Sequence, residues 1–200
     1  MNTDFFAKKA GTYEQNPNRV DNVENIARAI IAAVDLDRSM TIMDFGSGTG
    51  LLLERVAPYV GKISAVDVSP SMNAQLLAKT ETLPCELEML QLDLEQSDLD
   101  RKFDGIISSM TMHHIKDVPA MFSKFHNMLD DGGFVAIADI DTEDGSFHSE
   151  DTGVHHLGFD RDEFADAASS AGFHDVTVTS ASVVHKPQGD YPVFLLSAFK

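Results

Sequence analysis

A short glycine-rich turn is the part of this sequence best suited to bind a ligand. It reads Asp44-Phe-Gly-Ser-Gly-Thr-Gly50, follows an apolar run and precedes a helical pattern that begins at Leu51. Glycines permit positive φ and close approach of a ligand, and the following helix offers free N–H groups. The turn differs from the dinucleotide fingerprint G-x-G-x-x-G, because Leu51 stands where the third glycine belongs. Asp44 would repel a pyrophosphate but suits a ligand that carries an ammonium group.

Two more acids follow apolar runs of strand length. Asp67 comes near the end of the second run, where a carboxylate can accept hydrogen bonds from both hydroxyls of a ribose. Asp93 follows the third run, where it can accept a hydrogen bond from the exocyclic amine of a base. The alternatives are a helix N-cap for Asp67, for which Ser69 and Ser71 are better placed, and an exposed loop acid for Asp93.

The elements that must position these acids alternate along the chain. Strands are predicted at Thr41–Phe45, Ile63–Val68, Leu87–Leu92, Phe103–Ser108, Phe134–Ile140, Val176–His185 and Val193–Phe199. Helices are predicted at 21–35, Leu51–Tyr59, Ser71–Lys79, Val118–Leu129 and Asp160–Ala171.

This alternation predicts an α/β fold with a doubly wound, seven-stranded sheet and helices on both faces. Only KPQGDY separates the last two strands, so they must be antiparallel. We therefore expect a parallel sheet except for one antiparallel strand near the C-terminal edge. In such sheets ligands bind at the carboxyl ends of the strands, where the glycine turn and both acids should meet.

The glycine turn, together with three acids at the ends of three successive strands, resembles the class I S-adenosylmethionine-dependent methyltransferases. The resemblance covers the chain from about Phe5 to Lys200 and favours the small-molecule branch that includes the ubiquinone and menaquinone methyltransferases. The stretch Phe103–Ser109 is similar to the family's fourth-strand motif. Leu129–Phe134 is similar to its turn into strand five, although Asp130-Asp131 replace the usual Lys-Pro.

The resemblance implies a Rossmann-like fold, S-adenosylmethionine as cofactor and a cofactor site built from matching residues. In that site Asp67 would hold the ribose, Asp93 the adenine amine, and the glycine turn the methionyl end. The implied cofactor-binding residues are Tyr13, Asp44, Gly46, Ser47, Gly48, Gly50, Asp67, Val68, Asp93, Leu94, Ser109 and Met110.

The resemblance also implies how one domain of residues 1–200 is divided. Residues 1–38 would form an N-terminal helical lid, in which Tyr13 approaches the methionyl carboxylate. Residues 40–200 would form the Rossmann-like core, and the segment 141–159 would be an insertion that covers the substrate.

Methyl transfer from a sulfonium is an in-line displacement that mainly needs alignment and exclusion of water. A base is required only if the acceptor must lose a proton. His113 and His114 are the candidates, because imidazole titrates near neutral pH; stacking on adenine or capping of a helix are the alternatives.

A zinc site is the other chemistry that the histidines suggest. His148, His155 and His156 lie in one loop with Glu150 and Asp151. Adjacent His155 and His156 are poorly arranged for joint ligation, so we expect no metal.

Composition narrows the choice of partner. Fifteen Lys and Arg against 32 Asp and Glu give a net charge of −17, and no basic patch interrupts it. Such a field repels phosphate backbones, so neither DNA nor RNA is expected as a partner. No run is apolar and long enough to insert into a membrane, and the N-terminus lacks the apolar core of a secretory signal. The single Cys85 fits the core of a protein in a reducing cytoplasm.

These observations predict a methyltransferase that acts on a small-molecule acceptor. Two rivals remain: a non-catalytic S-adenosylmethionine-binding or regulatory protein on the same fold, and an NAD-type oxidoreductase. Methylation of a protein or tRNA is a narrower alternative, which the negative charge disfavours in the case of tRNA.

Overall fold

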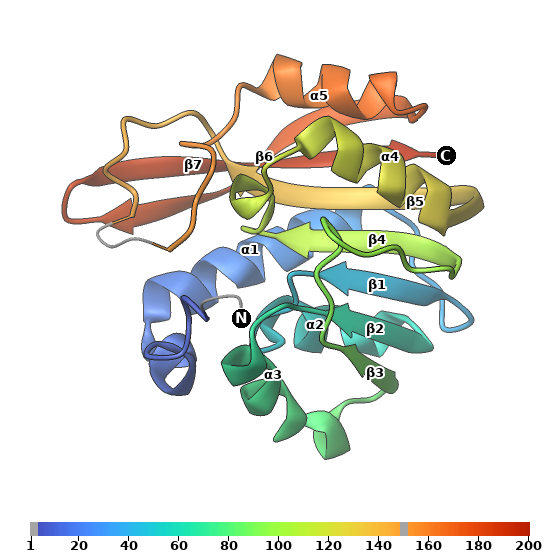
Figure 1. Ribbon diagram of the computed structural model, residues 1–200, viewed down its shortest axis with the longest axis horizontal. Coiled ribbons are helices and arrows are strands. Elements are labelled where there is room, and N and C mark those ends of the chain that lie inside the picture. Colours follow the sequence, from blue (N-terminus) through green and yellow to red (C-terminus); the bar gives the residue numbers. More distant parts are fainter. Residues whose placement is uncertain (1–3, 149–151) are drawn as a thin grey trace.

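The fold was determined as a computed structural model that describes residues 4–148 and 152–200 (Figure 1). Its centre is a seven-stranded sheet with the order β3-β2-β1-β4-β5-β7-β6. The strands are β1 Thr41–Phe45, β2 Lys62–Val66, β3 Glu86–Leu90, β4 Phe103–Ser109, β5 Leu129–Ile140, β6 His174–Lys186 and β7 Gly189–Phe199. All pairs among β1 to β5 are parallel, and β7 runs antiparallel to both β5 and β6. The predicted α/β sheet with one antiparallel strand is therefore confirmed.

Within residues 4–148 and 152–200, five α-helices connect and cover the strands. They are α1 Pro17–Ala33, α2 Leu51–Val56, α3 Pro70–Leu77, α4 Val118–Met128 and α5 Arg161–Ser170. Local sequence explains where they start: Asn16, Ser69 and Asp117 each accept a hydrogen bond from a backbone N–H of the first turn. A proline follows each of these caps at the first or second helical position, where its missing N–H costs nothing.

The last two strands are longer than the apolar pattern predicts. β6 and β7 form one hairpin whose register runs from His174 opposite Phe199 to Lys186 opposite Gly189. Much of β6 is exposed and carries Thr, Ser and His side chains, so its apolar alternation is weak. In Figure 1 the hairpin end projects to the left, beyond the ends of the neighbouring strands.

Side chains alternate between the two faces of the sheet and join two cores. In β4, Ile107 packs in the core with α1 and α2, whereas Ile106 packs in the core with α4 and α5. The second core is rich in phenylalanine, with edge-on contacts of Phe122 to Phe125 and Phe164. Because both faces are covered, the inner strands carry mostly apolar side chains on both faces.

The carboxyl ends of the parallel strands point to the left of Figure 1. Three other segments reach the same side of the sheet: the N-terminal turn η1 (Ala10–Gln15), the connection between β5 and α5, and the β6–β7 hairpin end. A hydrogen bond of 2.9 Å from the Asn18 side chain to the His185 carbonyl ties the start of α1 to that hairpin. A site at the strand ends is therefore enclosed by parts of the chain that are distant in sequence.

Helix α1 is part of the first core. Ile26 and Ile30 on this helix are fully buried and pack with residues of α2, β1 and β7. Within the described residues, no helix combines the length and the apolar character needed to cross a membrane.

The burial of α1 gives a prediction for stability. Ile26→Ala should lower the free energy of unfolding by about 2–5 kcal/mol, because it removes a fully buried side chain and leaves a cavity. Val183→Ala, on the exposed side of β6, is the control and should change it by less than about 1 kcal/mol. Urea unfolding measures both, and an unchanged midpoint for Ile26→Ala would show that α1 lies outside the cooperative core.

Candidate active site

A cavity of about 630 Å³ lies at the carboxyl ends of the strands. Eleven of the residues expected at the site line it: Tyr13, Gly46, Gly48, Asp67, Val68, Asp93, Leu94, Ser109, Met110, His113 and His114. Asp44, Ser47 and Gly50 do not line it. Ser47 is buried, and Gly50 packs close to the Leu76 side chain, so both belong to the scaffold of the glycine turn.

The glycine turn needs its glycines for conformation and for space. Gly46, Gly48 and Gly50 all have positive φ, between 54° and 88°. A Cβ at Gly46 would overlap the Thr111 side chain, and one at Gly50 would overlap Leu76. The Gly46 and Ser47 N–H groups both donate to the Val66 carbonyl, which fixes the turn against the end of β2. The turn is thus held from behind while Gly46 and Gly48 face the cavity.

Asp67 joins the loops that follow β1 and β2. Its Oδ2 accepts the Gly48 N–H at 2.8 Å, and its Oδ1 accepts the Ser69 N–H at 2.7 Å. Burial raises the pKa of this carboxyl above its ordinary value, while the two N–H donors lower it. The adjacent Val68 is 54% exposed and lines the cavity, which places an apolar surface beside the acid.

Asp93 lies on the cavity wall but has local partners. Its Oδ1 accepts the Glu95 N–H at 3.0 Å, and its Oδ2 accepts a side-chain N–H of Gln96 at 2.8 Å. The neighbouring Leu94 is buried and also lines the cavity. Asp93 therefore shapes its own turn and presents a polar edge next to apolar Leu94.

Asp44 lies behind the glycine turn. It is 1% exposed, and its Oδ2 has no hydrogen-bond partner among the described residues. Burial, followed by the negative charge of Asp67, raises the pKa of Asp44 to about 8. The sequence predicts direct contact of Asp44 with a ligand, but Asp44 does not line the cavity, and its raised pKa leaves it protonated and uncharged at neutral pH.

The chain turns sharply where β4 ends. Met110 adopts a φ of 58°, unusual for a residue with a side chain, and its N–H donates to the Ala138 carbonyl at 2.9 Å. The buried Ser109 hydroxyl has no partner among the described residues, and Ser109 lines the cavity. The short turn η4 (Met112–His114) follows and brings both predicted histidines to the cavity.

His113 is held by a buried acid that sequence reasoning did not single out. Its Nδ1 lies 2.7 Å from Oδ1 of Asp139, and its backbone N–H donates to Oδ2 of the same residue. Both side chains are almost completely buried. Because a carboxylate only accepts hydrogen bonds, Nδ1 carries the proton and Nε2 is left as a base.

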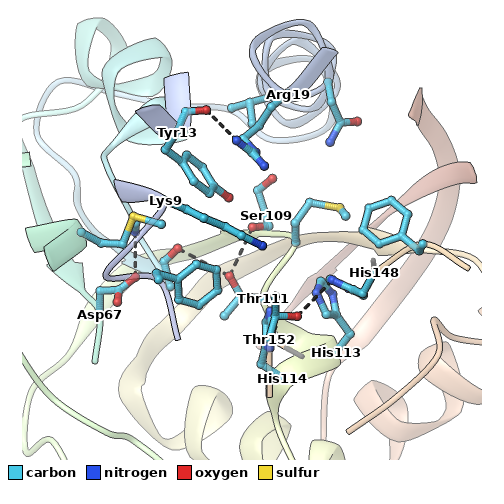
Figure 2. Close-up of a pocket in the computed structure, with 18 of the residues that line it drawn as sticks. Lys9, Tyr13, Arg19, Asp67, Ser109, Thr111, His113, His114, His148 and Thr152 are labelled. Carbon is cyan, nitrogen blue, oxygen red and sulfur yellow. Dashed lines mark hydrogen bonds between the residues drawn. The ribbon is translucent and has the colours of Figure 1, made fainter. Parts of the chain in front are cut away.

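Two other imidazoles pack beside His113. The ring of His114 lies 4.3 Å and that of His148 lies 5.2 Å from the His113 ring, measured between centroids. Burial, followed by the charge of His113, lowers the pKa of His114 and of His148 to about 4. Both are therefore neutral near pH 7. Figure 2 shows the three rings together on one side of the cavity, with Asp67 on the other.

The zinc arrangement does not form among the residues that the structure describes. No group of three or more His, Cys, Asp or Glu side chains in 4–148 and 152–200 is arranged to hold a metal ion. The His155 and His156 N–H groups donate to the His113 carbonyl, and His156 Nε2 lies 2.9 Å from the Ile115 carbonyl. Glu150 and Asp151 lie outside the described residues.

Several cavity residues were not predicted. Lys9 and Arg19 come from the N-terminal region, and Lys186 comes from the hairpin end. Asp139 does carry a sequence signal, since it interrupts the apolar run that ends at Ile140. Arg19 and Lys186 carry none, because only the tertiary fold brings them to the cavity.

The raised pKa of Asp44 predicts a pH dependence of stability. Unfolded, this carboxyl loses its proton near its ordinary pKa of 3.8, whereas folded it keeps the proton up to about pH 8. The folded state then binds more protons in that window, so the free energy of unfolding falls as pH rises through it. Asp44→Asn removes this dependence, and its stability relative to wild type should rise by more than about 1 kcal/mol from pH 4 to pH 8.

Chemical unfolding at a series of pH values measures this difference. Asp130→Asn makes the same substitution at an exposed position near the start of β5, at the opposite end of the sheet, and is the control. A pH-independent difference for Asp44→Asn would show that Asp44 is ionised in the folded chain.

The His113–Asp139 contact predicts one tautomer. In ¹⁵N-labelled protein at pH 8, Nδ1 of His113 should resonate as a protonated nitrogen and Nε2 as an unprotonated one, because Asp139 accepts the Nδ1 proton. Long-range ¹H–¹⁵N spectra assign both nitrogens. A proton on Nε2 would contradict the assignment of Nε2 as a base.

Comparison with known proteins identifies the family. Residues 19–178 match the family model described as a methyltransferase domain. An uncharacterized methyltransferase of Schizosaccharomyces pombe is 29% identical over 168 residues, covering 76% of this chain and 57% of that protein. The chain spans about half the length of the first curated relatives it matches.

Solved structures share the fold. A methyltransferase bound to the Haloferax volcanii Trm112 methyltransferase activator has a TM-score of 0.77 at 18% identity, covering 100% of this chain and 99% of that one. Haemonchus contortus phosphoethanolamine N-methyltransferase 2, solved with phosphomonomethylethanolamine and S-adenosylhomocysteine, has a TM-score of 0.73 at 16% identity, covering 98% and 59%. The family match covers most of the chain, and the chain therefore belongs to the methyltransferase-domain family.

Proposed function

We propose that this chain transfers a methyl group from S-adenosylmethionine to a small-molecule acceptor in the cavity at the strand ends. The observation that carries the proposal is the hydrogen bond from the Gly48 N–H to Asp67, which fixes a glycine turn and an acid on one wall of a cavity of about 630 Å³. The cavity is large enough for a nucleoside cofactor and a small acceptor together.

The residues present fit the cofactor at both ends. On the adenosine side, exposed Val68 and buried Leu94 offer apolar surfaces, and Asp67 and Asp93 offer carboxyl oxygens to hydroxyl and amine groups. On the methionyl side, Gly46 and Gly48 leave open backbone, which a Cβ would close at Gly46. The unpartnered Ser109 hydroxyl is a further polar group on the cavity wall. Tyr13 and Met110 complete this side, while Asp44, Ser47 and Gly50 support the turn from behind.

When bound, S-adenosylmethionine supplies a methyl group that its sulfonium has already activated. The chain's own task is to align the acceptor with that methyl group and to exclude water. His113 Nε2 can take a proton from the acceptor, and Asp139 keeps the imidazole in the tautomer that leaves Nε2 free. Neutral His114 and His148 flank His113 without adding positive charge.

We place the lid in the segment before α1, because α1 itself is part of the core. Asp4 accepts hydrogen bonds from the Ser69 hydroxyl and the Ser71 N–H, and Glu14 pairs with Lys79. These polar contacts are individually weak and can open more readily than the buried face of α1. The insertion 141–159 supports a covering role as well, since Phe147, His148 and Thr152 line the cavity.

The enclosure of the cavity and the net charge of the chain favour a small-molecule acceptor. A net charge of −17 opposes nucleic acids, and the cavity is walled by the N-terminal segment and the insertion. The similar Haemonchus enzyme, named for phosphoethanolamine, was solved with a small amine phosphate, which supports a small-molecule acceptor here.

Calorimetric titration with S-adenosylhomocysteine tests the cofactor site. We expect micromolar binding, and Asp67→Asn should weaken it by about tenfold or more, because one charged acceptor of hydrogen bonds is lost. Asp130→Asn is the control, and it should bind S-adenosylhomocysteine with the wild-type affinity. NADH should not bind.

Methyl transfer separates the enzyme from a non-catalytic binding protein. With ³H-methyl S-adenosylmethionine and a small-molecule extract of the source cells, label should appear in the fraction that passes ultrafiltration. Tight binding of S-adenosylhomocysteine without any transfer would favour the regulatory alternative. Absence of S-adenosylhomocysteine binding would refute the proposed function.

A further inference from the structure

Three basic side chains line the cavity of a strongly acidic chain, together with the acids Asp67, Asp93 and Glu95. Lys9, Arg19 and Lys186 all line it, although the chain has only 15 Lys and Arg against 32 Asp and Glu. They come from the N-terminal segment, the first turn of α1 and the end of β6, so the fold assembles them from three separate places.

Lys186 and Arg19 differ from several basic residues elsewhere on the surface, which are paired with acids. Lys62, Arg55 and Arg161 each lie within 2.7 Å of a carboxylate. For Lys186 and Arg19, by contrast, no carboxylate of residues 4–148 or 152–200 lies within ion-pair distance. Arg19 instead donates to the Tyr13 carbonyl, and its guanidinium lies 3.8 Å from the centre of the Tyr13 ring.

Lys186 belongs to the acceptor end of the cavity. Its Nζ donates to the Phe147 carbonyl and lies 3.4 Å from the centre of the Phe147 ring. The Phe147 ring contacts His148 at 4.8 Å, and His148 contacts His113 at 5.2 Å, between centroids. Lys186 is therefore separated from the base proposed for the acceptor by only two intervening side chains.

Two further features of the cavity around Lys186 and His148 are consistent with a bound anion. Burial lowers the pKa of Lys186, and so do the charges of Arg19 and Lys9, whereas the charge of Glu143 raises it. An anion beside Lys186 would reduce the repulsion from Arg19 and Lys9. The Nε2 atom of His148 is buried and has no hydrogen-bond partner among the described residues. If the Thr152 hydroxyl donates to Nδ1 of His148, Nε2 carries the proton and can donate it.

Two anions could enter such a cavity: the carboxylate of the cofactor and an anionic group of the acceptor. Arg19 stacks on Tyr13, the residue that we place near the methionyl carboxylate, so Arg19 belongs to the cofactor side. Lys186 approaches from the hairpin end and packs on Phe147 of the insertion. Resting on the proposed function, we infer that the methyl acceptor carries a carboxylate or phosphate group and that Lys186 binds it.

The test uses simple anions as probes. Protein saturated with S-adenosylhomocysteine is titrated calorimetrically, at constant ionic strength, with malonate, with inorganic phosphate and with uncharged malonamide. We expect saturable binding of at least one anion and none of malonamide. Lys186→Gln should weaken anion binding by about tenfold or more, because a charged donor is lost. Lys116→Gln, exposed and outside the cavity, removes the same charge and should leave anion binding unchanged.

The titrations with different anions distinguish a carboxylate acceptor from a phosphate acceptor. Binding of malonate alone assigns a carboxylate acceptor, binding of phosphate alone assigns a phosphate, and binding of both supports an anion of either kind. Failure of both anions to bind wild-type protein, or equal binding by Lys186→Gln, overturns the inference. It is also overturned if Lys186→Gln weakens S-adenosylhomocysteine but not 5′-methylthioadenosine, since Lys186 would then serve the cofactor carboxylate.

Failure of the proposed function gives a different result. If S-adenosylhomocysteine does not bind, the cofactor assignment fails, whereas the same anion titrations on the free protein still report on Lys186. The wild-type comparison of malonate with malonamide needs no variant, so the inference stays testable if Lys186→Gln does not fold.

Discussion

The hydrogen bond between the Gly48 N–H and the Asp67 carboxyl holds together the wall on which the whole site depends. It joins the loops that follow β1 and β2. Because these two strands are adjacent and parallel, both loops begin at the same edge of the sheet. The geometry requires glycine on one side, since the turn has positive φ and its back is filled by Thr111 and Leu76. On the other side the geometry requires an acceptor for the Gly48 N–H, and this acceptor is the largely buried carboxyl of Asp67.

The same edge of the sheet concentrates groups that are costly to bury. Asp44, Asp139 and His113 are each almost fully buried, and only the last two satisfy one another. Asp44 keeps an oxygen without a partner among the described residues, and burial, followed by the charge of Asp67, raises its pKa. Buried ionisable groups are typical of functional sites, where a protein gives up stability to pre-organise charge and hydrogen bonds.

Sequence reasoning predicted the parts of the structure that local patterns control. The alternation of apolar runs with helical spacing predicted all seven strands and the antiparallel return, and Ser69 caps α3 as expected. The pocket wall made by Gly46, Asp67 and Ser109 follows from the same logic, because strand ends of a parallel sheet meet.

The other half of the cavity could not be predicted in this way. The extent of β6 was underestimated because its exposed polar side chains hide the period-two pattern. Lys186 reaches the cavity only because the hairpin extends past the sheet and is tied to the start of α1 across 167 residues by the Asn18–His185 bond. A single sequence gives no local signal for such a contact. Helix α1 likewise has the sequence pattern of an amphipathic helix, which does not tell that it packs with α2, β1 and β7.

A crystal structure with S-adenosylhomocysteine tests the central claim most directly. We predict the ribose hydroxyls on the Asp67 carboxyl, the adenine between Val68 and Leu94, and the homocysteine sulfur directed toward the His113 side of the cavity. Adenine and ribose bound away from Asp67, or a glycine turn that makes no contact with the ligand, would contradict the proposed site.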